Sequence, residues 1–121
     1  MIQPPLQKLV LHDIRLPVVL GWYPEERQHT QEVRLDITIR FAHNTATVSD
    51  ELAHTVCYTE LITRLKGALS AKSFKLIEHA CYACYHMIKS YIDNAISVTL
   101  TKLIIPIEHL HGGAAYTCSD F

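Results

Sequence analysis

Apolar and polar residues alternate strictly between positions 33 and 41 of this 121-residue chain. The apolar positions are Val33, Leu35, Ile37, Ile39 and Phe41, and the polar ones are Arg34, Asp36, Thr38 and Arg40. Successive side chains of a strand point to opposite faces, so this period predicts a strand with one buried face and one polar face. We expect the polar face to meet solvent or a partner subunit.

Three other segments have strand or turn character. Residues 6–20 are largely apolar with a bend expected near Asp13, which predicts either one long bent strand or a tight pair of strands. The stretch 96–101 alternates again, and residues 114–120 follow a Gly-Gly turn as a candidate last strand. Residues 21–27 contain Gly and Pro and predict a loop or short turn.

Helical spacing of apolar residues predicts two helices in the middle of the chain. The first covers 58–70 and the second about 76–92. Strands and helices therefore follow the order β-β-α-α-β-β, grouped rather than alternating. This order predicts an α+β fold with a four-stranded antiparallel sheet and both helices packed on one face.

Size and composition are those of one globular domain spanning residues 1–121. Hydrophobic residues make up 49% of the chain, charged residues 19%, and the formal net charge is −1. This balance gives no reason to expect binding to nucleic acid or to an anionic membrane. No apolar run reaches the roughly 18 residues of a membrane span, and the N-terminus lacks a secretory signal pattern, so we expect a cytoplasmic protein with its four cysteines as thiols.

His79, Cys81, Cys84 and His86 have the residue types of a zinc site. On a helix that begins at Leu76, however, each residue is rotated by about 100° around the helix axis. Counted from Leu76, the two histidines lie at about 300° and 280°, whereas the two cysteines lie at about 140° and 80°, in the apolar stripe. Side chains on opposite sides of a helix cannot converge on one tetrahedral ion. We therefore expect buried thiols here, and exposed loop histidines at His109 and His111, with no metal site.

Four residues are candidates for chemistry, although each also permits an ordinary structural role. Glu78 lies in the first turn of the second helix, where free N–H groups favour a carboxylate. Lys102 ends a strand on its apolar side, as either a snorkelling edge residue or a desolvated acid/base. Tyr58 begins a helix and can pack or reach outward, and Glu26 taken by itself is interpreted as a solvated acid in a turn.

Five short blocks occur in a fixed order between about residues 8 and 118. They are Gly21-Trp22-Tyr23-Pro24-Glu25-Glu26 with Gln31, Ser49-Asp50-Glu51-Leu52, Thr55-Val56-Cys57-Tyr58, Phe74-Lys75-Leu76-Ile77-Glu78-His79, and Thr101-Lys102. In sequence and spacing they resemble the dihydroneopterin aldolase family. Two departures stand out: Cys57 replaces the Asp, His or Asn common in the family, and Leu103-Ile104-Ile105 separates Lys102 from Pro106.

The resemblance implies a lyase of folate biosynthesis with a tunnelling-type fold. Such enzymes cleave 7,8-dihydroneopterin by a retro-aldol reaction into 6-hydroxymethyl-7,8-dihydropterin and glycolaldehyde. The dihydropterin carries a C=N bond beside its side chain, so protonation of the ring nitrogen provides the electron sink. Neither a metal ion nor a lysine Schiff base is then required, and we expect no cofactor.

Residue roles also follow from the resemblance. Glu78 would anchor the pterin through paired N–H bonds, and the backbones of Ile77 and Val56 would complete recognition of the ring edge. Lys102 would act as general acid/base through an ordered water. Tyr58 would stack near the pterin and deliver the proton that quenches the enamine, while Glu26 would hold the hydroxylated side chain or support Lys102.

The family's assembly implies a homo-oligomer, as a ring of four or an octamer, with each site between subunits and the segment 56–58 contributed by a neighbouring subunit.

Two alternative functions remain open at this stage. One is the dihydroneopterin triphosphate 2′-epimerase branch of the same fold, which uses the same cleavage, and epimerisation also occurs as a side activity of aldolases. The other is a pterin-binding module without catalysis.

Overall fold

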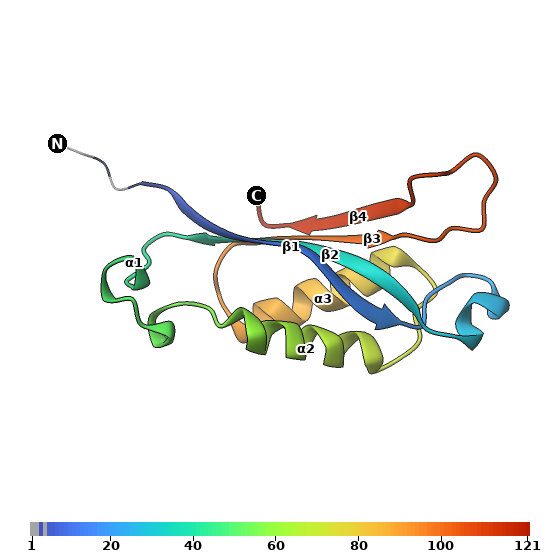
Figure 1. Ribbon diagram of the computed structural model, residues 1–121, viewed down its shortest axis with the longest axis horizontal. Helices are drawn as coiled ribbons and strands as arrows, with labels where there is room; N and C mark the ends of the chain where they lie inside the picture. The colour runs from blue at the N-terminus through green and yellow to red at the C-terminus, as the bar shows by residue number, and fades with distance from the viewer. Residues whose placement is uncertain (1–2, 4) are drawn as a thin grey trace.

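The computed structural model describes residue 3 and residues 5–121. Four strands and three helices, with two short 3-10 segments, follow one another along the chain (Figure 1). In chain order they are β1 (Gln7–Val18), η1 (Pro24–Gln28), β2 (Gln31–Phe41), α1 (Ala46–Ser49), η2 (Leu52–His54), α2 (Tyr58–Ser70), α3 (Ile77–Tyr91), β3 (Ile96–Lys102) and β4 (Ala114–Ser119).

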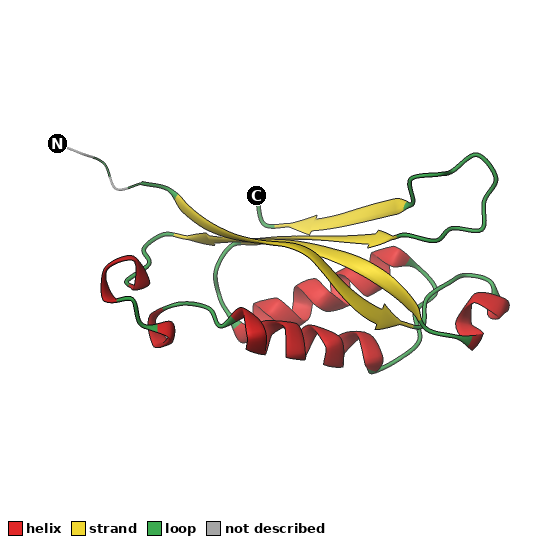
Figure 2. Ribbon diagram, in the orientation of Figure 1, coloured by secondary structure: helices red, strands yellow, loops and turns green. Residues whose placement is uncertain are grey.

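The four strands form one antiparallel sheet in the order β1-β2-β3-β4. Helices α2 and α3 lie antiparallel to each other on the same face of this sheet (Figure 2). The predicted α+β architecture is therefore confirmed, together with both long helices and all four strands. The three short helical segments in the loops carry no apolar period long enough to predict them.

The core lies between the sheet and the two long helices. The apolar side chains of β2 and β3 that point towards the helices are fully buried, as the alternation predicts, except for Phe41 at the end of β2, which is half-buried. Helix α2 buries Leu61, Leu65 and Leu69 against them, a spacing of one turn. Helix α3 buries Cys81 and Cys84, whereas His79 and His86 are exposed. The predicted separation of thiols and imidazoles is thus confirmed.

A bulge near Asp13 decides between the two interpretations of the first apolar segment. The pairing of β1 with β2 shifts register between Leu11 and Ile14, and Asp13 has a φ of 57°. Its amide nitrogen donates to an Asp36 carboxylate oxygen 3.0 Å away, so the extra residue is held by the neighbouring strand. The segment is one long bent strand, because the bulge bends it without ending its pairing.

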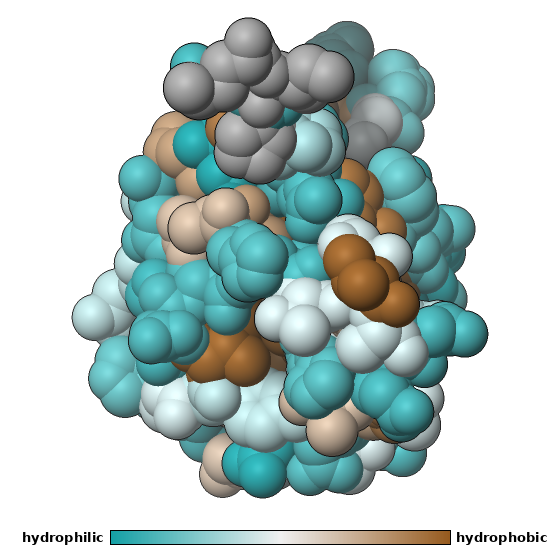
Figure 3. Space-filling model, turned by 90° about the vertical axis from the view of Figure 1, so that its left-hand side faces the viewer, coloured by the Kyte–Doolittle hydropathy of each residue, from teal (hydrophilic) through white to brown (hydrophobic). Residues whose placement is uncertain are grey.

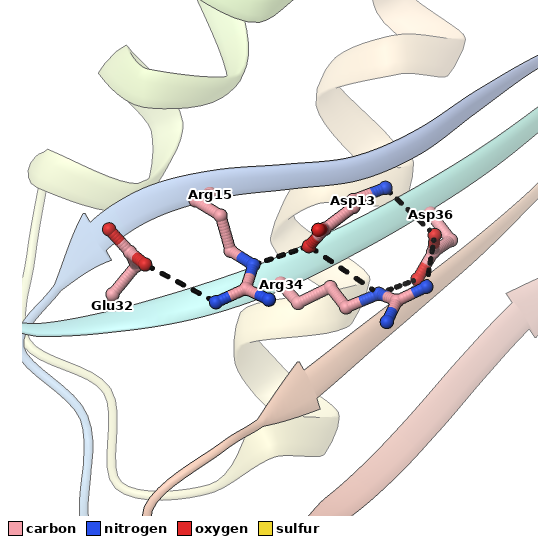
Figure 4. A network of polar contacts seen from close by, with 5 residues as sticks. All are labelled: Asp13, Arg15, Glu32, Arg34 and Asp36. Carbon is pink, nitrogen blue, oxygen red and sulfur yellow. Dashed lines mark hydrogen bonds and ion pairs between the residues drawn. The ribbon is translucent and has the colours of Figure 1, made fainter.

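The sheet face away from the helices is polar and carries a chain of alternating charges (Figure 4). Arg15 contacts Asp13 and lies 3.4 Å from Glu32, while the Arg34 guanidinium lies 2.8 Å from Asp36. These side chains are partly exposed, so this face is covered by charge rather than by other parts of the same chain.

The C-terminus is tied to the middle of the molecule by Asp120. Its carboxylate accepts hydrogen bonds from the Tyr85 hydroxyl, from Lys89 at 2.9 Å and from the Ile96 amide at 2.9 Å. These three donors, first the Tyr85 hydroxyl, lower the pKa of Asp120 to about 2. Asp120 therefore connects the end of β4 to both α3 and the start of β3.

Within residues 3 and 5–121, no helix combines the length and the apolar character needed to cross a membrane. The same part of the chain contains no group of three or more His, Cys, Asp or Glu side chains arranged to hold a metal ion. His109 and His111 are exposed in the loop between β3 and β4, as predicted.

Candidate active site

Lys102 and Glu26 form an ion pair at one end of the sheet. The Lys102 Nζ lies 2.6 Å from the Glu26 Oε2, and the two side chains are only 10% and 15% exposed. Lys102 is the one charged residue among the buried residues in the described part of the chain. Because charged side chains are rarely buried without a partner, the contact with Glu26 accounts for a lysine at this buried position.

The position of Lys102 follows from strand geometry. It is the last residue of β3 and shares its face with Val98 and Leu100, so its side chain points into the layer between sheet and helices. Its backbone pairs with Val33 on one side and Ala114 on the other. The next turn packs closely on it, because a Cβ on Gly113 would stand 2.5 Å from the Lys102 carbonyl oxygen. The lysine is thus held at a fixed point of the sheet.

Glu26 reaches the lysine from the turn that contains η1. A Cβ added to Gly21 would stand 2.3 Å from the Cβ of Glu26, so only glycine lets the two segments approach this closely. The Tyr23 amide donates to the other Glu26 carboxylate oxygen at 3.4 Å. The Lys102 hydrogen bond, and to a lesser extent the Tyr23 amide, hold the pKa of Glu26 below its usual value. Glu26 is therefore ionised at neutral pH, and its interpretation as a solvated acid is wrong because the folded chain covers it.

Glu78 and Ile77 lie in the first turn of α3, at the same end of the molecule as this pair. The Gly21 amide donates to the Phe74 carbonyl at 3.0 Å, and Leu20 pairs with Phe74 as an isolated bridge. The η1 turn and the segment leading into α3 are consequently neighbours, as Figure 1 shows at its right-hand side. Glu78 is exposed and Ile77 half-buried, so the carboxylate is accessible to a ligand.

Val56 and Tyr58 lie at the other end. Val56 lines a hollow of about 660 Å³ together with Tyr91 and Ile92, where α3 ends. Helix α3 rises about 20 Å from Glu78 to Tyr91, at 1.5 Å per residue, so Glu78 and the Tyr91 side of this hollow are separated by roughly that distance. Tyr58 begins α2 here and is 52% exposed. One chain therefore brings together Glu26, Lys102 and the start of α3, but it does not bring Tyr58 to them.

The surface around Tyr58 is partly apolar. Val48 in α1 and Leu52 in η2 are 91% and 62% exposed. Figure 3 views this end of the molecule and shows separate hydrophobic patches among hydrophilic ones. At the Lys102 end, Trp22, Ile104 and Ile107 are similarly exposed, at 61%, 70% and 57%. Both ends thus expose large apolar side chains beside candidate site residues.

The arrangement can transfer protons. An ammonium paired with a carboxylate in a sheltered position can donate a proton and later take one back. The charge of the carboxylate stabilises the ammonium between these two steps. The sequence predicted no role for Arg27 or Gly113. In the structure Arg27 binds the Gly21 carbonyl in the turn that carries Glu26, and Gly113 packs against the Lys102 carbonyl. The glycine could have been suspected from the Gly112-Gly113 turn, whereas the contacts of Arg27 had no sequence signal.

Comparison with known proteins agrees with the geometry. A family model described as dihydroneopterin aldolase matches residues 9–119. A probable dihydroneopterin aldolase of Chlamydia pneumoniae is 28% identical over 118 residues, covering 93% of this chain and 87% of that protein.

Two solved structures have the same fold. A dihydroneopterin aldolase structure from Vibrio cholerae, described as putative, superposes with a TM-score of 0.83 at 19% identity, covering 96% of this chain and 99% of that one. The Escherichia coli dihydroneopterin aldolase in complex with neopterin superposes with a TM-score of 0.80 at 15% identity, covering 93% and 99%. Because the family model spans nearly the whole chain, including Glu26, Glu78 and Lys102, this protein belongs to the dihydroneopterin aldolase family of enzymes.

Proposed function

We propose that this enzyme cleaves 7,8-dihydroneopterin into 6-hydroxymethyl-7,8-dihydropterin and glycolaldehyde. The observation that carries the proposal is the sheltered contact of 2.6 Å between Lys102 and Glu26 in a chain of this family. A retro-aldol reaction needs one proton removed from a hydroxyl and one delivered to the electron sink, which a paired lysine can do.

The substrate itself provides the electron sink in this mechanism. The C=N bond of the dihydropterin lies beside the side chain, so the electrons of the breaking C–C bond move into the ring as its nitrogen gains a proton. The side-chain hydroxyl loses its proton and becomes the aldehyde of glycolaldehyde. The ring is left as an enamine; protonation at the side-chain carbon, with release of the proton from the ring nitrogen, restores the C=N bond and gives the hydroxymethyl product.

Lys102 acts as the acid/base in this proposal, through one ordered water. A lysine that forms a Schiff base must first be a neutral amine. Here the neighbouring Glu26 is ionised, as its lowered pKa indicates, and its carboxylate lies 2.6 Å from the Lys102 Nζ. The pair thus supports proton transfer by Lys102 rather than covalent attachment of the substrate.

The exposed carboxylate of Glu78 anchors the pterin ring in this proposal. It accepts two N–H bonds, from the ring amine and the adjacent ring nitrogen, and such charge-assisted pairs fix orientation as well as adding affinity. The backbones of Ile77 and Val56 contact the remaining ring edge. The same fold in the Escherichia coli enzyme holds neopterin, which supports a pterin as the ligand class.

A second copy of the chain completes the site in this proposal. Tyr58 is meant to deliver the final proton, yet it begins α2 at the end of the molecule remote from Glu78. A neighbouring copy that docks this end against Lys102 would supply Tyr58 and Val56, and the exposed apolar side chains at both ends support such a contact. We therefore infer a ring-shaped homo-oligomer, of four subunits or two stacked rings.

Incubation with 7,8-dihydroneopterin in the presence of a chelator tests the proposed reaction. We expect glycolaldehyde and 6-hydroxymethyl-7,8-dihydropterin in equal amounts by chromatography, with borohydride trapping no protein adduct. A requirement for added metal, or a borohydride-stable adduct on Lys102, would contradict the mechanism.

The same assay separates the related activities. Accumulation of the 2′-epimer without glycolaldehyde would assign the chain to epimerisation, and the triphosphate substrate should be run in parallel. Binding of neopterin without any conversion would identify a pterin-binding module instead.

A further inference from the structure

Three successive carbonyl groups in the turn before η1 are all held by side chains. The Gln31 Nε2 donates to the Leu20 carbonyl at 2.7 Å. The Arg27 Nη1 donates to both the Gly21 and the Trp22 carbonyls, each at 2.8 Å. Carbonyls in an irregular turn lack the regular partners of a helix or strand, so these donors replace them. The turn is therefore held in one shape by Arg27 and Gln31.

Gly21 is the part of this turn that touches the candidate site. Its α-carbon hydrogen faces the Glu26 side chain, since a Cβ there would stand 2.3 Å from the Glu26 Cβ and 2.8 Å from its Oε1. The side chain of Glu26 thus lies against the Gly21 backbone over its whole length. A shift of Gly21 would move the carboxylate relative to Lys102, which is fixed at the end of β3.

Within the described residues Arg27 forms no hydrogen bond or ion pair with the Glu26 carboxylate, and its charge is the smallest of the causes that lower the pKa of Glu26, after the Lys102 hydrogen bond and the Tyr23 amide. The hydrogen bonds of Arg27 in the described structure go to the two carbonyls, and a guanidinium cannot lose its charge to release them near neutral pH. The arginine follows Glu26 directly in the chain, so one residue of η1 reaches Lys102 while the next holds the backbone behind it.

We propose that Arg27 is a positioning residue, which fixes the Gly21–Trp22 backbone so that Glu26 stays within hydrogen-bond distance of Lys102. This role deepens the proposed function, because it concerns the same ion pair, and it rests on that function only for its effect on turnover. Loss of the guanidinium frees the two carbonyls to bind water and lets the turn relax. The carboxylate then leaves the lysine part of the time, and the pair loses its fixed geometry.

Arg27→Met and Arg27→Lys test this proposal, with Arg64→Met as the matched control. Arg64 lies on α2, where it pairs with Glu60 far from this turn in the sequence. For Arg27→Met we expect kcat to fall by roughly 10- to 100-fold while KM changes less than about threefold, because misplacement affects the reacting groups more than binding. The acid limb of the pH–rate profile should move to higher pH, since Glu26 loses part of the Lys102 hydrogen bond that lowers its pKa.

The conservative variant adds a second criterion. A lysine at position 27 can place one charged nitrogen near both carbonyls, as Arg27 does through the single Nη1 atom. Arg27→Lys should therefore recover part of kcat and of the pH profile. An Arg27→Met enzyme with the kcat and pH profile of Arg64→Met would overturn the proposal, as would a fall in kcat with no shift of the pH profile in any Arg27 variant.

Carboxylate NMR tests the positioning role without turnover. In the wild-type chain with ¹³C-labelled glutamate, the Glu26 signal, assigned with Glu26→Gln, should titrate below the ordinary glutamate range. In Arg27→Met it should move up towards that range, and in Arg64→Met it should not. If the wild-type chain shows this shift but cleaves no dihydroneopterin, the proposed function fails and the positioning role stands. If Glu26 titrates identically in all variants, the positioning role fails.

Discussion

The Lys102 ammonium and the Glu26 carboxylate lie 2.6 Å apart although 76 positions separate them in the chain. Lys102 is fixed by its strand, whereas Glu26 is brought to it by a turn that packs on Gly21. This asymmetry makes the turn the adjustable side of the pair. Changes in the turn should therefore disturb chemistry before they disturb the fold.

Replacement of Lys102 by Ala should reduce kcat by about 100-fold or more, as expected when a general acid/base is lost. Neopterin binding should persist because Glu78 lies on a different element. Steady-state kinetics and calorimetric titration measure the two effects separately. Unchanged turnover would remove Lys102 from the mechanism, and Lys66→Ala, an exposed lysine on α2, is the control.

Replacement of Glu78 by Ala should weaken neopterin binding by about 10- to 100-fold, the usual effect of losing charge-assisted hydrogen bonds. The fold should be unaffected since this side chain is exposed. Glu60→Ala is the matched control, because Glu60 also lies in the first turn of a helix. Equal affinity of the wild type and the Glu78 variant in a fluorescence titration would refute the anchoring role.

A site shared between subunits should allow two inactive variants to complement each other. Lys102→Ala and Tyr58→Phe, co-expressed with different tags and purified as mixed assemblies, should recover about a quarter of wild-type sites when the copies mix at random in a ring. Each variant alone is the control. If mixed assemblies have no more activity than the variants alone, the site does not combine Lys102 and Tyr58 from different copies.

Gly21→Ala should separate the pair, because the new methyl group would overlap Glu26. We expect kcat to fall by about tenfold or more. Gly67→Ala is the control: Gly67 lies in α2 with open space around it, so alanine should raise stability by about 0.5–1 kcal/mol. Steady-state kinetics and thermal unfolding are measured for both variants. A fully active Gly21→Ala enzyme would contradict the close packing of the turn.

Asp120 should make stability depend on pH in the acid range. Its folded-state pKa is lowered to about 2 by the Tyr85, Lys89 and Ile96 donors, so the stabilisation is present above about pH 4 and is lost as pH falls towards 2. After allowance for solvent screening, we expect the Asp120 charge to contribute about 1 kcal/mol to the free energy of unfolding.

Urea unfolding of wild type and Asp120→Asn between pH 5 and 2 measures this difference. The gap in the free energy of unfolding between the two proteins should narrow with acid. A gap that stays constant over this range would show that the carboxylate charge of Asp120 does not contribute.

Much of the fold is determined by short-range pattern. A period of two made β2 and β3 recognisable, and helical spacing placed α2 at residues 58–70, because these periods decide which side chains can be buried together. The same reasoning put Cys81 and Cys84 inside and His79 outside. It also put Lys102 on the buried side of its strand, since position parity alone fixes the face.

Residue patterns alone gave no partner for Lys102; the family resemblance offered Glu26 as one possibility, and only the tertiary structure placed the two groups 2.6 Å apart. Glu26 looked like a solvated acid because no local period covers an irregular turn, and its burial depends on strand register and on the approach permitted by Gly21. The structure also placed Tyr58 and Glu78 at opposite ends, because α2 and α3 run antiparallel on the sheet. Contacts between residues distant in the chain arise from packing of whole elements, and no local sequence period encodes them.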